Sequence, residues 1–217
     1  MSSERERERE PGTLRIYLGA FPGVGKTYAM LSEAQRRKKY GEDVVVGFVE
    51  THRRAQTEAM LEGLDVIPRK RVEYRGLTVE EMDTDAILHR RPAVVLVDEL
   101  AHTNAPGSER EKRYEDVDVI RDAGINVVST LNVQHLESLN DTVEALTGVR
   151  VRETIPDRVV DEADELILID LSPEGARARM EHGHIYPPEQ ARSALEHFFR
   201  HENLAQLREI ALRRTAQ

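Results

Sequence analysis

The sequence predicts an α/β fold with a mostly parallel sheet, helices on both of its faces and extra helices at the C-terminal end. Short apolar runs alternate with helical patterns along the chain, as in parallel sheets whose strands are buried on both faces. Several of these runs end in polar residues, at the edge where open α/β sheets bind their ligands. The chain has 217 residues, which is enough for one α/β domain with a sizeable core.

Composition narrows the classes of function. The net charge is −9 and no half of the chain is strongly basic, which argues against a nucleic-acid partner. Cysteine is absent, which excludes disulfides and thiolate metal sites and suits a reducing cytoplasm. No apolar stretch approaches the roughly 18 residues that cross a bilayer, so we expect no direct membrane insertion. Glu and Arg alternate over residues 4–10, and we expect residues 1–12 to form a disordered charged tail before a single domain at 13–217.

The first half of the chain predicts three strands and three helices. A strand at 14–18 precedes a glycine-rich loop and a helix from Thr27 to Lys39, which ends before Gly41. The run Val44 to Val49 is the next buried strand; we expect the polar residues 50–54 at its end to face a ligand, before a helix of about ten residues to Gly63. Residues 69–74 favour a short extended segment. Thr78 to Glu81 matches a capping box that opens a helix to Arg90, and the strand at 94–97 follows.

The second half continues the alternation. Residues 101–113 lack a periodic apolar face and predict a long loop, a length that often has a function. The remaining expected elements are a helix at 114–123, a strand at 127–131, a helix ending at Gly148, a short helix at 157–163, a strand at 166–170, and C-terminal helices at 173–181, 188–200 and 203–214. We expect the C-terminal helices, residues 173–215, to pack on the sheet domain.

The glycine-rich loop is the most informative motif. Residues 19–27 read GAFPGVGKT between a strand and a helix, the context of a phosphate-binding loop, and this predicts a P-loop NTPase-like three-layer fold. The match is to a relaxed pattern, because Ala20 occupies the position of the first glycine. Backbone N–H groups of such a loop converge on an anion, and its lysine contacts the β- and γ-phosphates. The residues expected to bind a nucleotide are Ala20, Pro22, Gly23, Val24, Gly25, Lys26 and Thr27.

A second half of the site follows the strand at 94–97. Asp98 and the Thr27 hydroxyl are expected to hold Mg²⁺, and Glu99 is a candidate general base that would polarise an attacking water. An Asp-Glu pair after an apolar run is by itself often an ordinary strand end, so the prediction depends on its combination with the loop. Guanine-specific motifs are absent, which favours ATP.

Other polar residues have weaker assignments. His102 and Gln134 are candidates for contact with the nucleotide, and an ordinary loop role is the alternative for both. His182 and His184 lack acidic or cysteine partners, so we assign no metal there. Arg110 and Arg113 could stabilise phosphate charge, but the favoured interpretation is that both are solvated.

Four stretches together resemble one family, the N-terminal cytoplasmic domain of the KdpD osmosensitive potassium-sensor histidine kinases. The stretches are 19–27, 50–52, 97–108 and 130–138, and the long block DELAHTNAPG from Asp98 to Gly107 is the most specific of them. The resemblance covers the chain from about Leu14 to its end. It implies a regulatory ATP-binding domain that tunes the kinase and phosphatase output of a two-component potassium sensor. The kinase core of such a sensor is not expected in this chain.

Two hypotheses of different classes follow. The first is a cytoplasmic, regulatory ATP-binding module whose partner is the remainder of a sensor kinase or a separate signalling protein. The second is an active P-loop ATPase or small-molecule phosphotransferase with Glu99 as its base. A scaffold with a degenerate phosphate site is a third possibility, which the intact Lys26 and Thr27 disfavour. The sequence leaves a homo-oligomer open.

Overall fold

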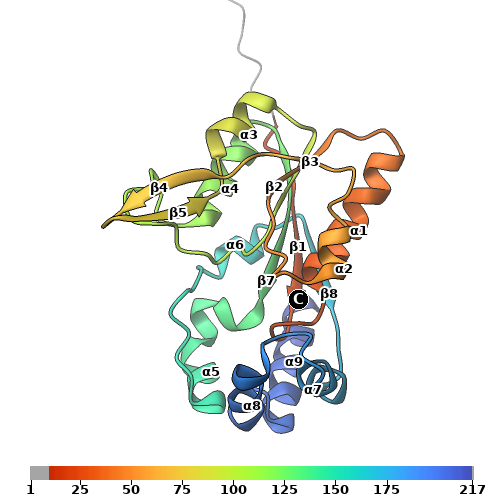
Figure 1. Cartoon of the computed structure of the whole chain (residues 1–217), viewed down its shortest axis with the longest axis vertical. Helices are drawn as coiled ribbons and strands as arrows, with labels where there is room; N and C mark the ends of the chain where they lie inside the picture. The colour runs from red at the N-terminus through yellow and green to blue at the C-terminus, as the bar shows by residue number, and fades with distance from the viewer. Residues whose placement is uncertain (1–9, 217) are drawn as a thin grey trace, which may run out of the picture.

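A computed structural model, which describes residues 10–216, has a six-stranded parallel sheet in the order β3-β2-β6-β7-β1-β8 (Figure 1). Its strands are β1 (Leu14–Gly19), β2 (Val44–Phe48), β3 (Asp65–Val66), β6 (Val94–Val97), β7 (Asn126–Asn132) and β8 (Glu165–Ile169). Most of the predicted charged tail lies outside the described residues. At its end, the Gly12 N–H donates to the carbonyl of Arg121 at 2.7 Å.

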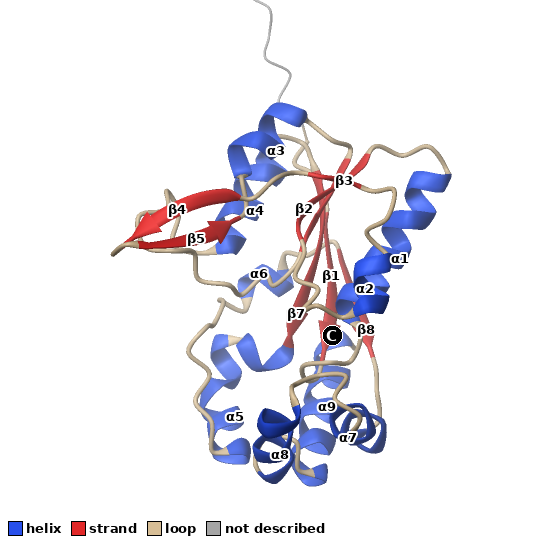
Figure 2. Cartoon of the chain, viewed as in Figure 1, coloured by secondary structure: helices blue, strands red, loops and turns tan. Residues whose placement is uncertain are grey.

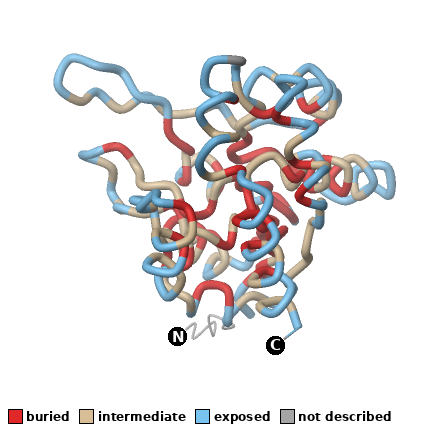
Figure 3. Tube along the Cα trace, turned by 90° about the horizontal axis from the view of Figure 1, so that it is seen from below, coloured by how far each residue is buried: buried red, intermediate tan, exposed pale blue. Residues whose placement is uncertain are grey.

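Alternation of side chains along the strands produces two cores, one on each face of the sheet. In β1, Ile16 and Leu18 belong to one buried cluster, whereas Tyr17 between them belongs to the other. The same division separates Val95 from Val94 in β6, since successive side chains of a strand point to opposite faces. Buried residues lie in the interior of the molecule and exposed residues lie at its surface (Figure 3).

Helices cover both faces and complete three layers, which confirms the predicted P-loop-like α/β fold (Figure 2). α1 (Lys26–Lys39) and the short α2 (Ala55–Ala59) lie together on one face. The opposite core is closed by α3 (Thr84–Arg90), α4 (Arg113–Asp122), α5 (Asn140–Thr147), α6 (Arg158–Asp161) and two 3₁₀ turns, η1 (Val133–His135) and η2 (Glu137–Leu139).

The C-terminal helices α7 (Pro173–Glu181), α8 (Pro188–Glu196) and α9 (His201–Thr215) gather at the carboxyl ends of the strands (Figure 1). α9 contacts β8 and β1, and its Leu204 and Leu207 are completely buried. Among residues 10–216, none of the helices has both the length and the apolar character needed to cross a membrane.

The predicted capping box at Thr78 to Glu81 is wrong. Residues 77–81 form β5 (Leu77–Glu81), which pairs antiparallel with β4 (Lys70–Tyr74) in a hairpin that projects from the body (Figure 1). The turn at Arg75 and Gly76, both with positive φ, brings the two strands together. The helix begins only at Thr84, where the Asp83 side chain accepts from the N–H of Ala86. The helix predicted up to Gly63 is also shorter than expected, and α2 ends at Ala59.

Candidate functional site

A cavity of about 690 Å³ opens at the carboxyl ends of the central strands, which is within the size range of small-molecule sites. The segments that follow β1, β2, β6 and β7 supply most of its walls, and the loop between α7 and α8, the start of α8 and Glu153 also contribute. The residues predicted from two separate motifs, the glycine-rich loop and the segment that begins at Asp98, therefore meet in one place. Those that line it are Pro22, Gly23, Gly25, Lys26, Thr27, Asp98, Glu99 and His102.

The glycine-rich loop bends sharply between β1 and α1. Gly23 and Gly25 have φ values of 85° and 105°, a left-handed backbone that a Cβ would strain. Lys26, the first residue of α1, donates from Nζ to Oδ1 of Asn132 at the end of β7. Burial lowers the pKa of Lys26 to about 8, although part of the residue still borders the cavity. A cation that has already lost much of its hydration gains more from an anionic ligand.

Asp98 is buried and forms the centre of a hydrogen-bonded group at the end of β6. Its carboxylate accepts from the hydroxyls of Thr27, at 3.1 Å, and Thr130, and from the N–H of Glu50 at 3.2 Å. The Thr130 hydroxyl in turn accepts from the N–H of Glu99 at 3.0 Å. Three neighbouring strand ends thus fix one carboxylate beside the Thr27 hydroxyl in the first turn of α1. Carboxylate and hydroxyl oxygens are ligands of the kind that Mg²⁺ prefers.

Glu99 has a positive φ of 56°, which is uncommon for a residue other than glycine and costs energy. Its side chain is 41% exposed and lies between His52 Nε2, 3.7 Å away, and the Arg113 guanidinium, whose Nη1 is 3.9 Å away. Partial burial and the adjacent Asp98 charge raise the pKa of Glu99. A carboxylate with a raised pKa that borders a cavity suits a general base.

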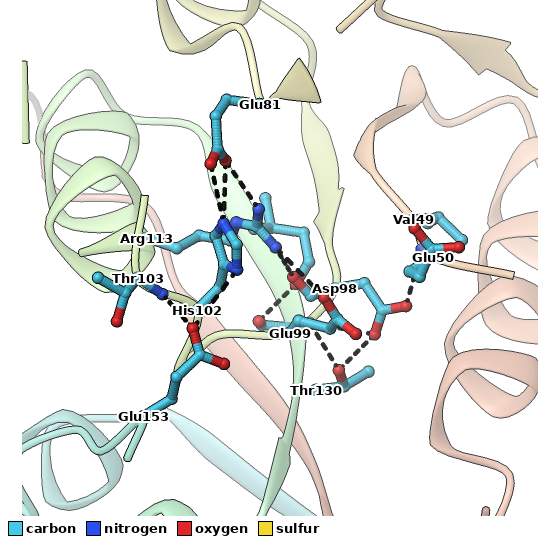
Figure 4. Close-up of polar contacts among 12 residues, drawn as sticks. Val49, Glu50, Glu81, Asp98, Glu99, His102, Thr103, Arg113, Thr130 and Glu153 are labelled. Atoms are coloured by element: carbon cyan, nitrogen blue, oxygen red, sulfur yellow. Dashed lines mark hydrogen bonds and ion pairs between the residues drawn. The ribbon is translucent and has the colours of Figure 1, made fainter. Parts of the chain in front are cut away.

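Next to Glu99 lies a polar cluster, which we define as Glu81, His102 and Arg113, and of which Glu81 and Arg113 are buried and His102 is partly buried (Figure 4). Arg113 has no exposed surface; it donates to the carbonyl of Asp98 at 3.1 Å and to Glu81 at 3.3 Å. Its guanidinium also lies 3.8 Å from the ring centroid of Phe48. His102 Nε2 is 3.0 Å from both carboxylate oxygens of Glu81. The solvated role favoured for Arg113 is therefore wrong, because this arginine bridges the β4–β5 hairpin and the end of β6.

The loop at residues 101–113 is held at both ends. The N–H of Arg113 donates to the carbonyl of His102 at 3.1 Å, and that of Asn104 donates to Glu111 at 2.8 Å. Glu81 accepts from the N–H of Ala105 at 2.8 Å, and Glu153 accepts from the N–H of Thr103 at 2.9 Å. This long segment is therefore a closed loop pinned to the hairpin and to the 149–156 segment.

Some expected contacts are not brought to the cavity. Of the predicted loop residues, Ala20 and Val24 are buried in the core. They are not among the residues that line the cavity in the described part of the chain. Gln134 is also not among the described residues that line the cavity, whereas its neighbour His135 is. The ring of His135 contacts the carbonyl of Glu153 at 2.7 Å, and burial lowers its pKa.

Sequence reasoning missed several residues that line or support the cavity. The sequence analysis assigned no role to Asn132, although a polar residue at the end of the strand beside β1 was a usable signal. Glu81 and Arg113 gave no local signal, since they lie 32 positions apart and meet only in the fold. The α7–α8 loop, with Ile185 and Tyr186, also lines the cavity although no motif marks it.

Comparison with known proteins identifies the family. The family profile described as "KdpD: Osmosensitive K+ channel His kinase sensor domain" matches residues 10–217. "Sensor protein KdpD" of Escherichia coli (strain K12) is 57% identical over 94% of this chain, and that of Mycobacterium tuberculosis (strain H37Rv) is 57% identical over 93%. The Clostridium acetobutylicum protein of the same name is 49% identical over 98% of the chain. The chain spans only 23%, 23% and 24% of the lengths of these relatives, respectively. It belongs to the KdpD family of osmosensitive potassium-sensor histidine kinases, within the region that the profile describes as the sensor domain.

Proposed function

We propose that this chain binds ATP with Mg²⁺ and acts as the cytoplasmic regulatory domain of a KdpD-type two-component system for potassium or osmotic signalling. The observation that carries the proposal is the convergence of Lys26, Thr27 and Asp98 in one cavity, with the Thr27 hydroxyl 3.1 Å from the Asp98 carboxylate. These are the three groups that hold phosphates and Mg²⁺ in P-loop nucleotide sites.

Each residue has a distinct part in this proposal. The N–H groups of the glycine-rich loop and Lys26 would hold the phosphates, since Gly23 and Gly25 leave the backbone accessible. Thr27 and Asp98 fit Mg²⁺, because their oxygens already lie together and Mg²⁺ uses few protein ligands beside phosphate and water. Bound Mg²⁺ would offset the charge of the phosphates.

Regulation is the role that the family supports. The relatives are sensor proteins of which this chain covers less than a quarter, so the remainder of a sensor kinase is the expected partner. Occupancy of the cavity would be read by that partner and would adjust its kinase or phosphatase output. A ligand can do so only if it binds two conformations with different affinities.

A second candidate is an active ATPase or small-molecule phosphotransferase. The specific observation that favours it is Glu99, whose partly exposed carboxylate with a raised pKa follows Asp98 directly. A base in this position would take a proton from water or from an acceptor hydroxyl.

Two measurements on this chain separate the candidates. Calorimetric titration with ATP and Mg²⁺ tests binding, with Lys26→Met as the matched variant because methionine fills a similar volume without charge. Equal affinity in folded wild-type and Lys26→Met proteins would refute the phosphate site. A phosphate-release assay then tests turnover: binding with negligible release supports the regulatory module, whereas turnover that depends on Glu99 supports the enzyme.

A further inference from the structure

The cavity has two walls of different chemistry. One wall consists of strand ends and carries the charged and hydroxyl groups of Lys26, Thr27 and Asp98. The other, which we call the aromatic wall, consists of Tyr28, Ile185, Tyr186, Pro187 and Gln190. Four of its five members come from the α7–α8 loop and the start of α8. A site for phosphates and metal alone would have no use for such a wall.

Several contacts fix the aromatic wall against the glycine-rich loop. A Cβ on Gly23 would lie 2.4 Å from Cδ1 of Ile185, so the Ile185 side chain packs directly on this glycine. Arg179 donates to the carbonyl of Gly23 at 3.0 Å, and Arg54 donates to the carbonyl of Ile185 at 3.2 Å.

A chain of aromatic rings adds to this link. Phe21, in the glycine-rich loop, lies edge-on to Phe199 with ring centroids 6.2 Å apart. Phe199 contacts Tyr186 in the same manner at 6.3 Å. Edge-to-face pairs at these separations are favourable. Tyr186 is therefore held at a defined position relative to the loop, with part of its surface exposed to the cavity.

Sheet order gives the two walls a direction. β7 and β6 lie on one side of β1, and β6 leads to Asp98 and Glu99. β8 lies on the other side of β1 and leads through α7 to the aromatic wall. A triphosphate whose terminal phosphate faces Asp98 would extend its other end along the glycine-rich loop to the wall, where Ile185 packs on Gly23.

We propose that the aromatic wall is the nucleobase subsite, in which the Tyr186 ring stacks on the base and the Gln190 amide contacts its polar edge. The proposal rests on the proposed ATP-binding function. Stacking suits any base, because every base presents a π-face. The exposed Gln190 amide offers both donor and acceptor groups. The subsite should therefore distinguish a nucleotide from bare triphosphate more strongly than ATP from GTP.

The test compares Mg²⁺-ATP with Mg²⁺-tripolyphosphate, which has the phosphates and no base, by calorimetric titration of wild type and four variants. We expect Tyr186→Ala to weaken ATP binding about 5-fold to 150-fold, the range for loss of one base–aromatic stack, while tripolyphosphate affinity is unchanged. Tyr186→Phe, which keeps the ring, should restore ATP affinity to within about 2-fold of wild type. Tyr40→Ala is the matched control, since Tyr40 is 79% exposed and outside the described lining of the cavity.

Gln190→Ala serves as a second test that does not disturb packing, because its side chain is exposed; we expect ATP binding about 2-fold to 10-fold weaker. Unchanged ATP affinity in both Tyr186→Ala and Gln190→Ala would overturn the subsite. Equal weakening of ATP and tripolyphosphate would also overturn it, because the wall would then act only by shaping the loop. If wild type binds tripolyphosphate but holds ATP no more tightly, the subsite fails and the phosphate site stands; if it binds neither, the proposed function itself fails.

Discussion

Replacing Glu81 with glutamine removes the nearer carboxylate partner of the buried Arg113 and leaves it with Glu99, 3.9 Å away. Glu81 and Arg113 are almost completely inaccessible to solvent, and Glu81 also accepts from Ala105 and contacts His102. Removal of one member of a buried ion pair costs about 3–5 kcal/mol. The glutamine oxygen can keep one hydrogen bond, which recovers about 1 kcal/mol. We therefore expect Glu81→Gln to lower the free energy of unfolding by about 2–4 kcal/mol, or the Tm by about 5–15 °C.

Urea denaturation at several pH values measures the loss in free energy of unfolding and shows whether the charge of Glu81 causes it. Burial alone would raise the pKa of Glu81, but the contact with His102 and the charge of Arg113 hold it below its ordinary value of 4.5. A carboxyl with a lowered pKa stabilises the fold above its ordinary pKa, and this contribution disappears as pH falls through the lowered pKa. The difference between wild type and Glu81→Gln should thus be complete at pH 7 and shrink below about pH 4.5.

Glu80→Gln is the matched control, because Glu80 is the neighbouring residue in β5 and its side chain is 54% exposed. Its 3.8 Å pair with Arg69 is a surface pair, for which a loss of less than about 1 kcal/mol is expected. The reasoning is refuted if Glu81→Gln and Glu80→Gln unfold at the same urea concentration at pH 7. A difference that stays constant down to pH 3 would show that packing, not charge, is the cause.

Three further predictions concern the cavity. Lys26→Met should weaken ATP binding by at least about 100-fold, because a charge-assisted contact with the phosphates is lost. The fold should be retained, because burial already disfavours the lysine charge. Calorimetry tests the binding and thermal unfolding tests the fold. Glu99→Gln should bind ATP as well as wild type while any hydrolysis falls by about 10² or more, and equal phosphate release would show that Glu99 is not the base. Thr27→Ala should remove most of the dependence of ATP affinity on Mg²⁺, since a hydroxyl beside Asp98 is lost, and an unaltered Mg²⁺ dependence would contradict the metal assignment.

The sheet and the glycine-rich loop were predictable because their signals are local. Strands buried on both faces read as continuous apolar runs, and the loop motif fixes a strand before it and a helix after it. The hairpin was missed for an equally local reason: Thr78 to Glu81 satisfies a capping box, while its true pairing with β4 is set by the turn at Gly76 and by the partner strand.

Among the residues that surround the cavity, some positions could likewise be predicted from local sequence signals and others could not. Lys26, Thr27, Asp98 and Glu99 follow strands whose carboxyl ends must meet at one edge of a parallel sheet, so their meeting could be anticipated. The buried position of Arg113 could not, since it depends on a hairpin whose second strand was predicted as the start of a helix. Long-range packing of this kind leaves no periodic pattern in the sequence.

The link between Arg179 and Gly23 has a consequence for the order in which the protein is made. These residues lie 156 positions apart, yet the Arg179 side chain donates a hydrogen bond to the Gly23 carbonyl. At about 5–20 residues per second, ribosomes need roughly 8–30 s to extend the chain from Gly23 to Arg179. During that interval the sheet strands β1, β2, β6 and β7 can already pair, while the glycine-rich loop lacks its C-terminal cover. The proposed nucleotide site should consequently be complete only after α7 has been synthesised.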